Sequence, residues 1–228
     1  MISKIQLFGE RHSGTTWLEY LIRDNIREVE IVFNHGWKHG LPNYNSLIPI
    51  PEDTLFLIIH KNPYSWLLGM FEHPHHLPEL AMVSWEDFLS NDFRSYDIIT
   101  EQKIVETFDN IFKCREEKIA LFLLLRKVVK NIEFIKYEEL LENPKIELDF
   151  LAIKYNLAIW DSTIILEKYC LESAISIETF NKKDFYLKEE FFKKIPQHII
   201  EYITANLNWK LEEQIGYSKY LGGSHNES

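Results

Sequence analysis

The sequence is poor in cysteine and has no excess of positive charge. Its 228 residues include only two cysteines, Cys114 and Cys170, which lie far apart in the chain. A disulfide scaffold is therefore not expected, and this cysteine content is typical of a reducing compartment. The formal net charge is −10. Because general binders of nucleic acid or of anionic membranes are usually basic, neither class is favoured.

The sequence also has few long apolar runs. The most apolar one, residues 119–125, is far shorter than a membrane-spanning helix and is bounded by Lys118 and Arg126. The first residues lead directly into a β-strand pattern, without the basic and apolar regions of a secretory signal. We therefore expect a cytoplasmic protein without an integral membrane segment.

Apolar and aromatic residues are plentiful, at 46% and 14% of the chain. This content supports one α/β domain of ordinary size, and we find no repeat and no sign of a second domain. We expect a single domain over residues 1–221 and a short disordered tail over residues 222–228. The fold class that we predict is α/β, with three layers, a central and mostly parallel sheet, and additional C-terminal helices.

The segment that carries most information is residues 2–22, ISKIQLFGERHSGTTWLEYLI. It predicts a β-strand, then a loop bounded by Gly9 and Gly14, and then a helix that begins at Thr15. A helix N-terminus offers unpaired backbone N–H groups and partial positive charge, so this loop is suited to bind a phosphate or sulfate group. The side chains that add donors or positive charge here are Arg11, His12, Ser13, Thr15 and Thr16.

The two glycines have the spacing of a Walker A loop, but the lysine and hydroxyl residue that should follow are replaced by Thr15 and Thr16. The core of the loop, residues 13–17 with the sequence SGTTW, resembles the P-loop-like 5′-phosphosulfate loop of the sulfotransferases, usually written KSGTTW. These enzymes use 3′-phosphoadenosine 5′-phosphosulfate (PAPS) as their sulfuryl donor. The chain departs from the motif at His12, where the family has its lysine, with Arg11 beside it.

A second group of polar side chains follows the next predicted strand, residues 29–33. The loop over residues 34–40, NHGWKHG, contains His35, Lys38 and His39. Because ligands bind beyond the carboxyl ends of parallel strands, we expect this loop to lie on the same sheet edge as the first one. The two histidines are candidates for a general base, with His35 as first choice and His39 as second, and Lys38 is a candidate for charge stabilisation.

A third element is the apolar run over residues 54–59, which predicts a central parallel strand. Lys61, Asn62 and Pro63 follow it and resemble the RNP sequence of the sulfotransferase 3′-phosphate motif, with lysine in place of arginine. The helix serine of that motif corresponds to Gly69, and Ser65 is a candidate to replace it.

Later segments complete the predicted fold. We expect a long buried helix over residues 107–130, a strand over residues 131–136, and helices over residues 146–155 and 163–170. The strand with the YEEL sequence after it, and the closing segment over residues 207–217, resemble sulfotransferases as well. Lys182 and Lys183 lie in a late basic segment that is a candidate cover for the nucleotide.

The resemblance implies transfer of a sulfuryl group from PAPS to a hydroxyl or amine of a carbohydrate or small-molecule acceptor, with 3′,5′-adenosine diphosphate as the other product. It implies that Arg11 or His12 stabilises the leaving phosphate, that Trp17 stacks on adenine, and that Lys61 binds the 3′-phosphate. No metal is expected.

Two alternatives remain open from the residues alone: a degenerate P-loop kinase, and a nucleotide- or glycan-binding module without activity. The sequence specifies neither the acceptor nor the oligomeric state.

Overall fold

A computed structural model describes residues 1–74, 83–97, 103–160 and 183–220. Its centre is a sheet of parallel strands in the order β3-β1-β4-β7. The strands are β1 (Lys4–Gly9), β3 (Glu30–Val32), β4 (Thr54–His60) and β7 (Ile132–Lys136). The predicted parallel sheet is therefore confirmed, with the apolar run at residues 54–59 inside it.

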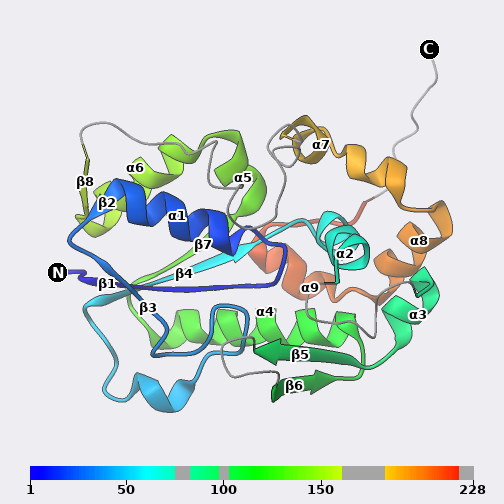
Figure 1. Ribbon diagram of the computed structural model, residues 1–228, viewed down its shortest axis with the longest axis horizontal. Helices are drawn as coiled ribbons and strands as arrows, with labels where there is room; N and C mark the ends of the chain where they lie inside the picture. Colours follow the sequence, from blue (N-terminus) through cyan, green and yellow to red (C-terminus); the bar gives the residue numbers. More distant parts are fainter. Residues whose placement is uncertain (75–82, 98–102, 161–182, 221–228) are drawn as a thin grey trace.

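Helices cover both faces of the sheet and make it the middle of three layers (Figure 1). One face packs on α1 (Thr15–Asn25), α5 (Tyr137–Glu142) and α6 (Pro144–Tyr155), and the other packs on α4 (Ile111–Val128). Because side chains alternate along a strand, Leu57 faces the first group, whereas its neighbour Phe56 faces α4. Burial on both faces explains the continuous apolar run of β4.

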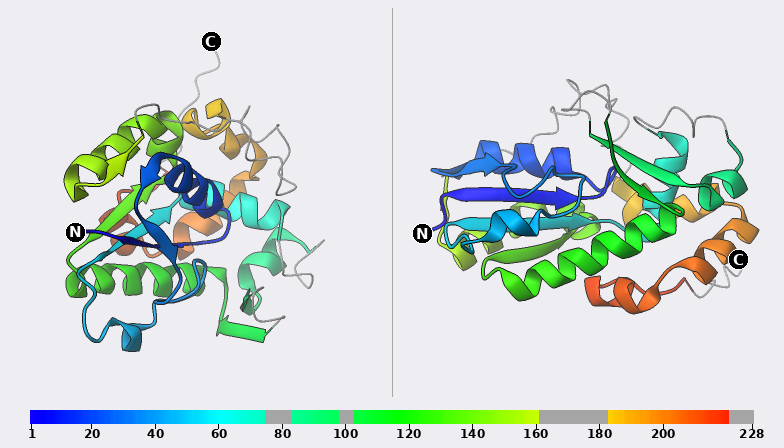
Figure 2. Two further views of the ribbon diagram at one scale, coloured as in Figure 1. Left: turned by 60° about the vertical axis from the view of Figure 1, so that its left-hand side comes forward. Right: turned by 90° about the horizontal axis from the view of Figure 1, so that it is seen from below.

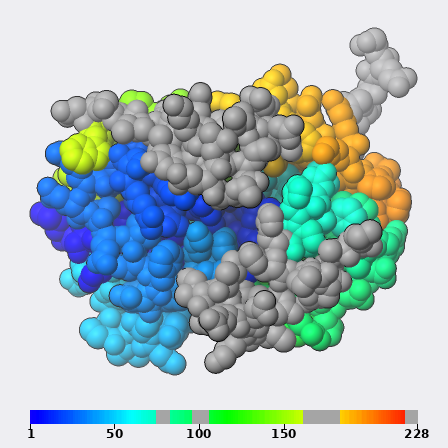
Figure 3. All heavy atoms as spheres, viewed as in Figure 1, coloured from blue at the N-terminus to red at the C-terminus, as the bar shows by residue number. Residues whose placement is uncertain are grey.

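A second core lies beyond the carboxyl ends of the strands. It joins α2 (Pro63–Glu72) and α3 (Trp85–Ser90) to the C-terminal helices α8 (Gln197–Asn206) and α9 (Trp209–Glu212). Figure 2 shows these helices grouped at one end of the molecule, and Figure 3 shows α2 between the N-terminal residues and the C-terminal helices. The shorter elements are β2 (Ile26–Arg27), β5 (Phe93–Asp97), β6 (Lys103–Phe108), β8 (Ala158–Ile159), α7 (Lys183–Leu187) and the 3-10 turns Tyr44–Leu47, Glu190–Lys194 and Glu213–Ile215.

One expectation needs correction, one pair of strands was not expected, and several expectations fall outside the described part of the chain. The helix predicted over residues 107–130 begins at Ile111, because Thr107 and Phe108 belong to β6 and the side chain of Asn110 caps the helix. The antiparallel hairpin of β5 and β6 was not predicted from the sequence. The helix expected over residues 163–170, Lys182 and the tail at residues 222–228 lie outside the described residues.

Across the described segments, none of the helices combines the length and the apolar character that crossing a bilayer requires.

Candidate active site

The first loop has the backbone conformation that its glycines predict. Gly14 lies in the left-handed region, with φ 93°, immediately before α1, and His12 also has a positive φ of 62°. A Cβ atom at Gly9 would lie 2.5 Å from the carbonyl oxygen of Ile59, so only glycine fits there. Among the described residues, no side chain caps the N-terminus of α1. The first N–H groups of this helix are therefore suited to bind an anion.

Two of the predicted ligands form contacts within the protein. The Ser13 hydroxyl donates to the carbonyl oxygen of Glu10 at 2.6 Å and is completely buried, so it closes the turn. The His12 ring packs over Gly69, and its Nε2 lies 2.7 Å from the carbonyl oxygen of His73. Both side chains thus take part in contacts that fix the loop to its surroundings, and their contacts with a phosphate stay predictions.

Lys38 and His39 do converge on the start of α1. Lys38 Nζ lies 3.3 Å from Thr16 Oγ1 and forms an ion pair with Glu19 at 2.9 Å. His39 Nε2 lies 3.5 Å from Thr15 Oγ1. The loop after β3 and the loop after β1 therefore meet at one place, as their positions after parallel strands predict.

The environment of His39 defines its protonation. Its Nδ1 lies 3.1 Å from the carbonyl oxygen of Gly9. Because a carbonyl can only accept, we assign the proton to Nδ1, which leaves the lone pair on Nε2 toward Thr15. Burial lowers the pKa of His39 well below its usual value, and the positive charges of Arg11 and Lys38 lower it further. The ring is therefore neutral at pH 7.

Arg11 lies beside this cluster. Its guanidinium sits over the ring of Trp37, 4.9 Å from the ring centroid, and Trp37 in turn contacts His39 edge to face. The backbone of Arg11 is held by Trp66, whose indole Nε1 donates to its carbonyl oxygen at 2.9 Å. Arg11 thus adds a second positive charge near Lys38.

His35 does not lie at the first loop. Its Nδ1 is 2.9 Å from Ser46 Oγ, and its backbone N–H donates to Gln6. Its ring packs on Phe56, on the face of the sheet that α4 covers. The structure therefore does not bring His35 together with the first loop, and His39 is the histidine that lies there.

Lys61 contacts two tyrosine rings, and one of these rings packs on the first loop. Its Nζ lies 3.8 Å from the ring centroid of Tyr186 and 4.6 Å from that of Tyr137. A Cβ atom at Gly14 would lie 2.6 Å from the Tyr137 ring, so this tyrosine packs directly on the first loop. Lys61 and the loop thus belong to one cluster, and the tyrosines cover part of it.

The two remaining candidates, Ser65 and Trp17, also have contacts within the protein. The Ser65 hydroxyl donates to the carbonyl oxygen of Asn62 at 3.1 Å and is buried, which argues against its expected contact with a phosphate. The Trp17 ring is partly buried against the sheet and contacts the edge of Tyr137 at 6.1 Å between centroids.

A buried ionic network under the loop was missed by the sequence analysis. Arg115, in α4, donates to Glu10 at 2.6 Å, to both carboxylate oxygens of Glu212, and to the carbonyl oxygen of Lys61 at 2.9 Å. The three charged side chains are almost completely buried. The network fixes the first loop to the second motif and to α9. Arg115 lies in a charged stretch of α4, residues 113–118 with the sequence KCREEK, so the sequence does not distinguish it from exposed charges.

Neither a protein-family model nor a curated protein matches the sequence. Among solved structures, the crystal structure of mouse sulfotransferase SULT7A1 complexed with PAP is similar, with 17% identity and a TM-score of 0.44. The similarity covers 82% of this chain but only 65% of that chain, less than two thirds of its length. The matched protein belongs to the family that the first loop resembles, and a likeness at this level of identity says nothing about the acceptor or the reaction.

Proposed function

We propose that this protein transfers a sulfuryl group from PAPS to a hydroxyl or amine of a small or carbohydrate acceptor in the cytoplasm. The observation that carries the proposal is the convergence of Lys38 and His39 on the first two residues of α1. This arrangement places a cation and a neutral imidazole at the mouth of an anion-binding loop whose sequence is SGTTW.

The residues around the first loop are suited to bind PAPS, the sulfuryl donor. The N-terminal N–H groups of α1 and the hydroxyls of Thr15 and Thr16 would hold the 5′-phosphosulfate. Lys61 would pair with the 3′-phosphate, exchanging its contacts with the tyrosine rings for a charged hydrogen bond. PAPS, when bound, supplies a sulfuryl group whose bond to phosphate oxygen breaks as the bond to the acceptor forms.

Each side chain around the first loop has its own role in this reaction. His39 Nε2 accepts the proton of the attacking hydroxyl or amine, because Nδ1 holds the ring through Gly9 and leaves Nε2 unprotonated. Lys38 and Arg11 stabilise the negative charge that grows on the leaving phosphate. His12, which occupies the family's lysine position, fixes the loop to α2 instead of acting on the phosphate.

The test is a transfer assay with ³⁵S-labelled PAPS and a panel of glycans and small alcohols and amines. We expect His39→Ala to lower turnover about 100-fold or more, the usual contribution of a general base. His35→Ala is the matched control: it removes a histidine from the same loop that lies against the sheet, so turnover should be retained. Equal losses in the two variants would contradict the role of His39. Binding of nucleotide without transfer to any acceptor would favour a binding module.

A further inference from the structure

The loop that carries Lys38 and His39 is attached to the rest of the protein on two sides. On one side it binds Gly9 of the first loop. The Gly9 N–H donates to the carbonyl oxygen of Lys38 at 2.9 Å, and the Gly9 carbonyl oxygen lies 3.1 Å from His39 Nδ1. On the other side it binds two charged side chains, Lys118 of α4 and Glu106 of β6. The position of His39 therefore depends on side chains from two further elements.

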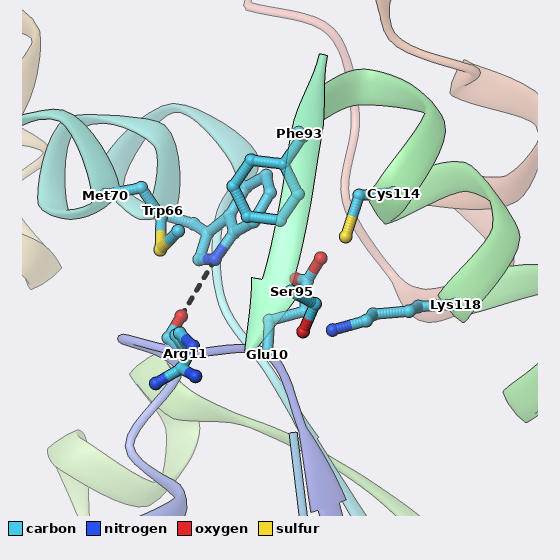
Figure 4. A pocket seen from close by; sticks show the side chains of 8 residues that line it. All are labelled: Glu10, Arg11, Trp66, Met70, Phe93, Ser95, Cys114 and Lys118. Atoms are coloured by element: carbon cyan, nitrogen blue, oxygen red, sulfur yellow. Dashed lines mark hydrogen bonds between the residues drawn. The ribbon is translucent and has the colours of Figure 1, made fainter. Parts of the chain in front are cut away.

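Lys118 binds the main chain of His39. Its Nζ donates to the carbonyl oxygen of His39 at 2.7 Å, and the residue is only 4% exposed. Figure 4 shows its side chain extending from α4, with the ammonium group directed toward Glu10, the residue after β1. A hydrogen bond from a charged donor is stronger than one between neutral groups, and more so away from water. Lys118 is therefore a strong attachment for the His39 backbone.

Glu106 binds the chain two residues further along, at Leu41. Its Oε1 accepts from the Leu41 N–H at 2.9 Å, and a Cβ atom at Gly40 would lie 3.8 Å from the same oxygen. The other carboxylate oxygen, Oε2, is buried and has no hydrogen-bond partner among the residues that the structure describes. Within these residues, the hydrogen bond of the Glu106 carboxylate thus goes to the end of this loop.

The charges of Lys118 and Glu106 also influence each other. Burial raises the pKa of the Glu106 carboxyl, and the positive charge of Lys118 opposes this change. Burial lowers the pKa of His39, and Lys118 adds to that effect. The segment from the carbonyl oxygen of His39 to the N–H of Leu41 is therefore held between a buried cation and a carboxyl group of opposite sign.

The proposed proton transfer depends strongly on where the imidazole lies. A general base must be within hydrogen-bond reach of the proton that it accepts. His39 Nε2 lies 3.5 Å from Thr15 Oγ1, at the start of α1. A displacement of about 1 Å in such an arrangement can lower a rate about 100-fold. Contacts that fix the backbone of His39 therefore affect turnover even though they lie away from the donor.

We propose that Lys118 and Glu106 are positioning residues, which hold the chain from His39 to Leu41 so that His39 Nε2 faces the start of α1. This inference rests on the proposed transfer function and adds two residues to those on which turnover depends. Neither residue exchanges a proton with the acceptor, because both act through the main chain of the loop.

The first test follows the His39 ring and needs no acceptor. In protein with ¹⁵N-labelled histidine, long-range ¹H–¹⁵N NMR spectra tell which ring nitrogen carries the proton, and His39→Gln identifies the His39 signal by its loss. We expect Nδ1 to be protonated in the wild type, where it bonds to Gly9. Lys118→Met and Glu106→Leu should each give a mixture of the two neutral tautomers. An unchanged signal in either variant would overturn the role of that residue.

Two further variants are matched to these. Glu106→Gln removes the charge but keeps an oxygen for the Leu41 N–H, so it should retain the wild-type signal. A glutamine variant that behaves like Glu106→Leu would contradict positioning through this bond. Lys113→Met removes an exposed lysine that pairs with Glu116 on the same helix, and should leave the signal unchanged. A changed signal in Lys113→Met would also contradict the inference.

The second test is the transfer assay. We expect kcat to fall about tenfold or more in Lys118→Met and Glu106→Leu, and to be retained in Glu106→Gln. Affinity for 3′,5′-adenosine diphosphate should stay the same, because neither residue binds the donor. Nucleotide affinity that falls in proportion to kcat, or a kcat that does not change, would overturn the inference. A protein that shows the tautomer change but transfers sulfate to no acceptor would refute the transfer function and leave the attachment of His39 standing.

Discussion

Two neighbouring residues have different proposed roles at the candidate site. Lys38 supplies a positive charge, and His39 accepts a proton. Lys38 extends to Thr16 and Glu19, whereas His39 turns back to the carbonyl oxygen of Gly9. Because His39 is buried among cations, it stays neutral, and the nitrogen that faces Thr15 carries the lone pair that we propose as the base. Their adjacency in the chain therefore places two different functions at one helix end.

Lys61 provides a test of nucleotide recognition at this scale. We expect Lys61→Met to weaken binding of 3′,5′-adenosine diphosphate about tenfold or more, since a charged hydrogen bond to phosphate is lost. Binding of 5′-AMP should change little, because it lacks the 3′-phosphate. Calorimetric titration measures both. Lys145→Met is the control, since this lysine is exposed on α6 and pairs with Asp149. Equal weakening of both nucleotides would argue against the 3′-phosphate assignment.

Sequence reasoning at the residue scale succeeded where backbone conformation decides the outcome. Gly9 and Gly14 require conformations and contacts that only glycine tolerates, so the loop could be predicted from their spacing. Sequence reasoning failed where the direction of a side chain decides its role. The sequence analysis ranked His35 before His39 from position alone, and only the path of the loop directs His35 to the sheet face and His39 to α1. The contacts of Ser13 with Glu10 and of His12 with His73 were hidden for the same reason.

At the scale of elements, the buried Arg115 network connects segments that are distant in sequence. It joins the first loop to α4 and α9, with partners 97 and 105 residues away from Arg115. No periodicity or local motif encodes such a contact, so it could not be predicted. The four strands of the parallel sheet could be predicted, because apolar runs and strand-loop-helix patterns are local signals.

Removal of Arg115 should be strongly destabilising. Arg115→Met leaves two carboxylates, Glu10 and Glu212, buried without their cation. We expect the free energy of unfolding to fall by about 3–5 kcal/mol in urea denaturation. The control is Arg126→Met on the same helix, where the arginine is exposed and the change should be below about 1 kcal/mol. A loss of similar size in both variants would show that the network does not stabilise the fold.

At the scale of the whole molecule, His60 couples the end of the central strand to the C-terminal segment. Its Nε2 lies 2.9 Å from the carbonyl oxygen of Ile215, and its ring packs against Phe134 and Tyr217. Burial lowers the pKa of His60 from 6.5 to about 3. The folded protein therefore keeps this histidine neutral under conditions in which the unfolded chain protonates it.

This difference predicts acid sensitivity. Between pH 6.5 and about 3 the unfolded state binds one more proton at His60, so stability is complete above pH 6.5 and falls as the pH is lowered. In wild type compared with His60→Phe, the slope of unfolding free energy against pH near pH 5 should be steeper by about 1.4 kcal/mol per pH unit. Urea denaturation at several pH values measures both slopes. Identical slopes would show that His60 is not the buried neutral group that we describe.

The most direct test of donor binding at the first loop is calorimetric titration of the wild-type protein with 3′,5′-adenosine diphosphate, 5′-AMP and adenosine. If the N-terminus of α1 and Lys61 hold the two phosphates, affinity should fall in that order, by about tenfold or more for each phosphate removed. Binding of 3′,5′-adenosine diphosphate no tighter than that of adenosine would contradict a donor site at this loop.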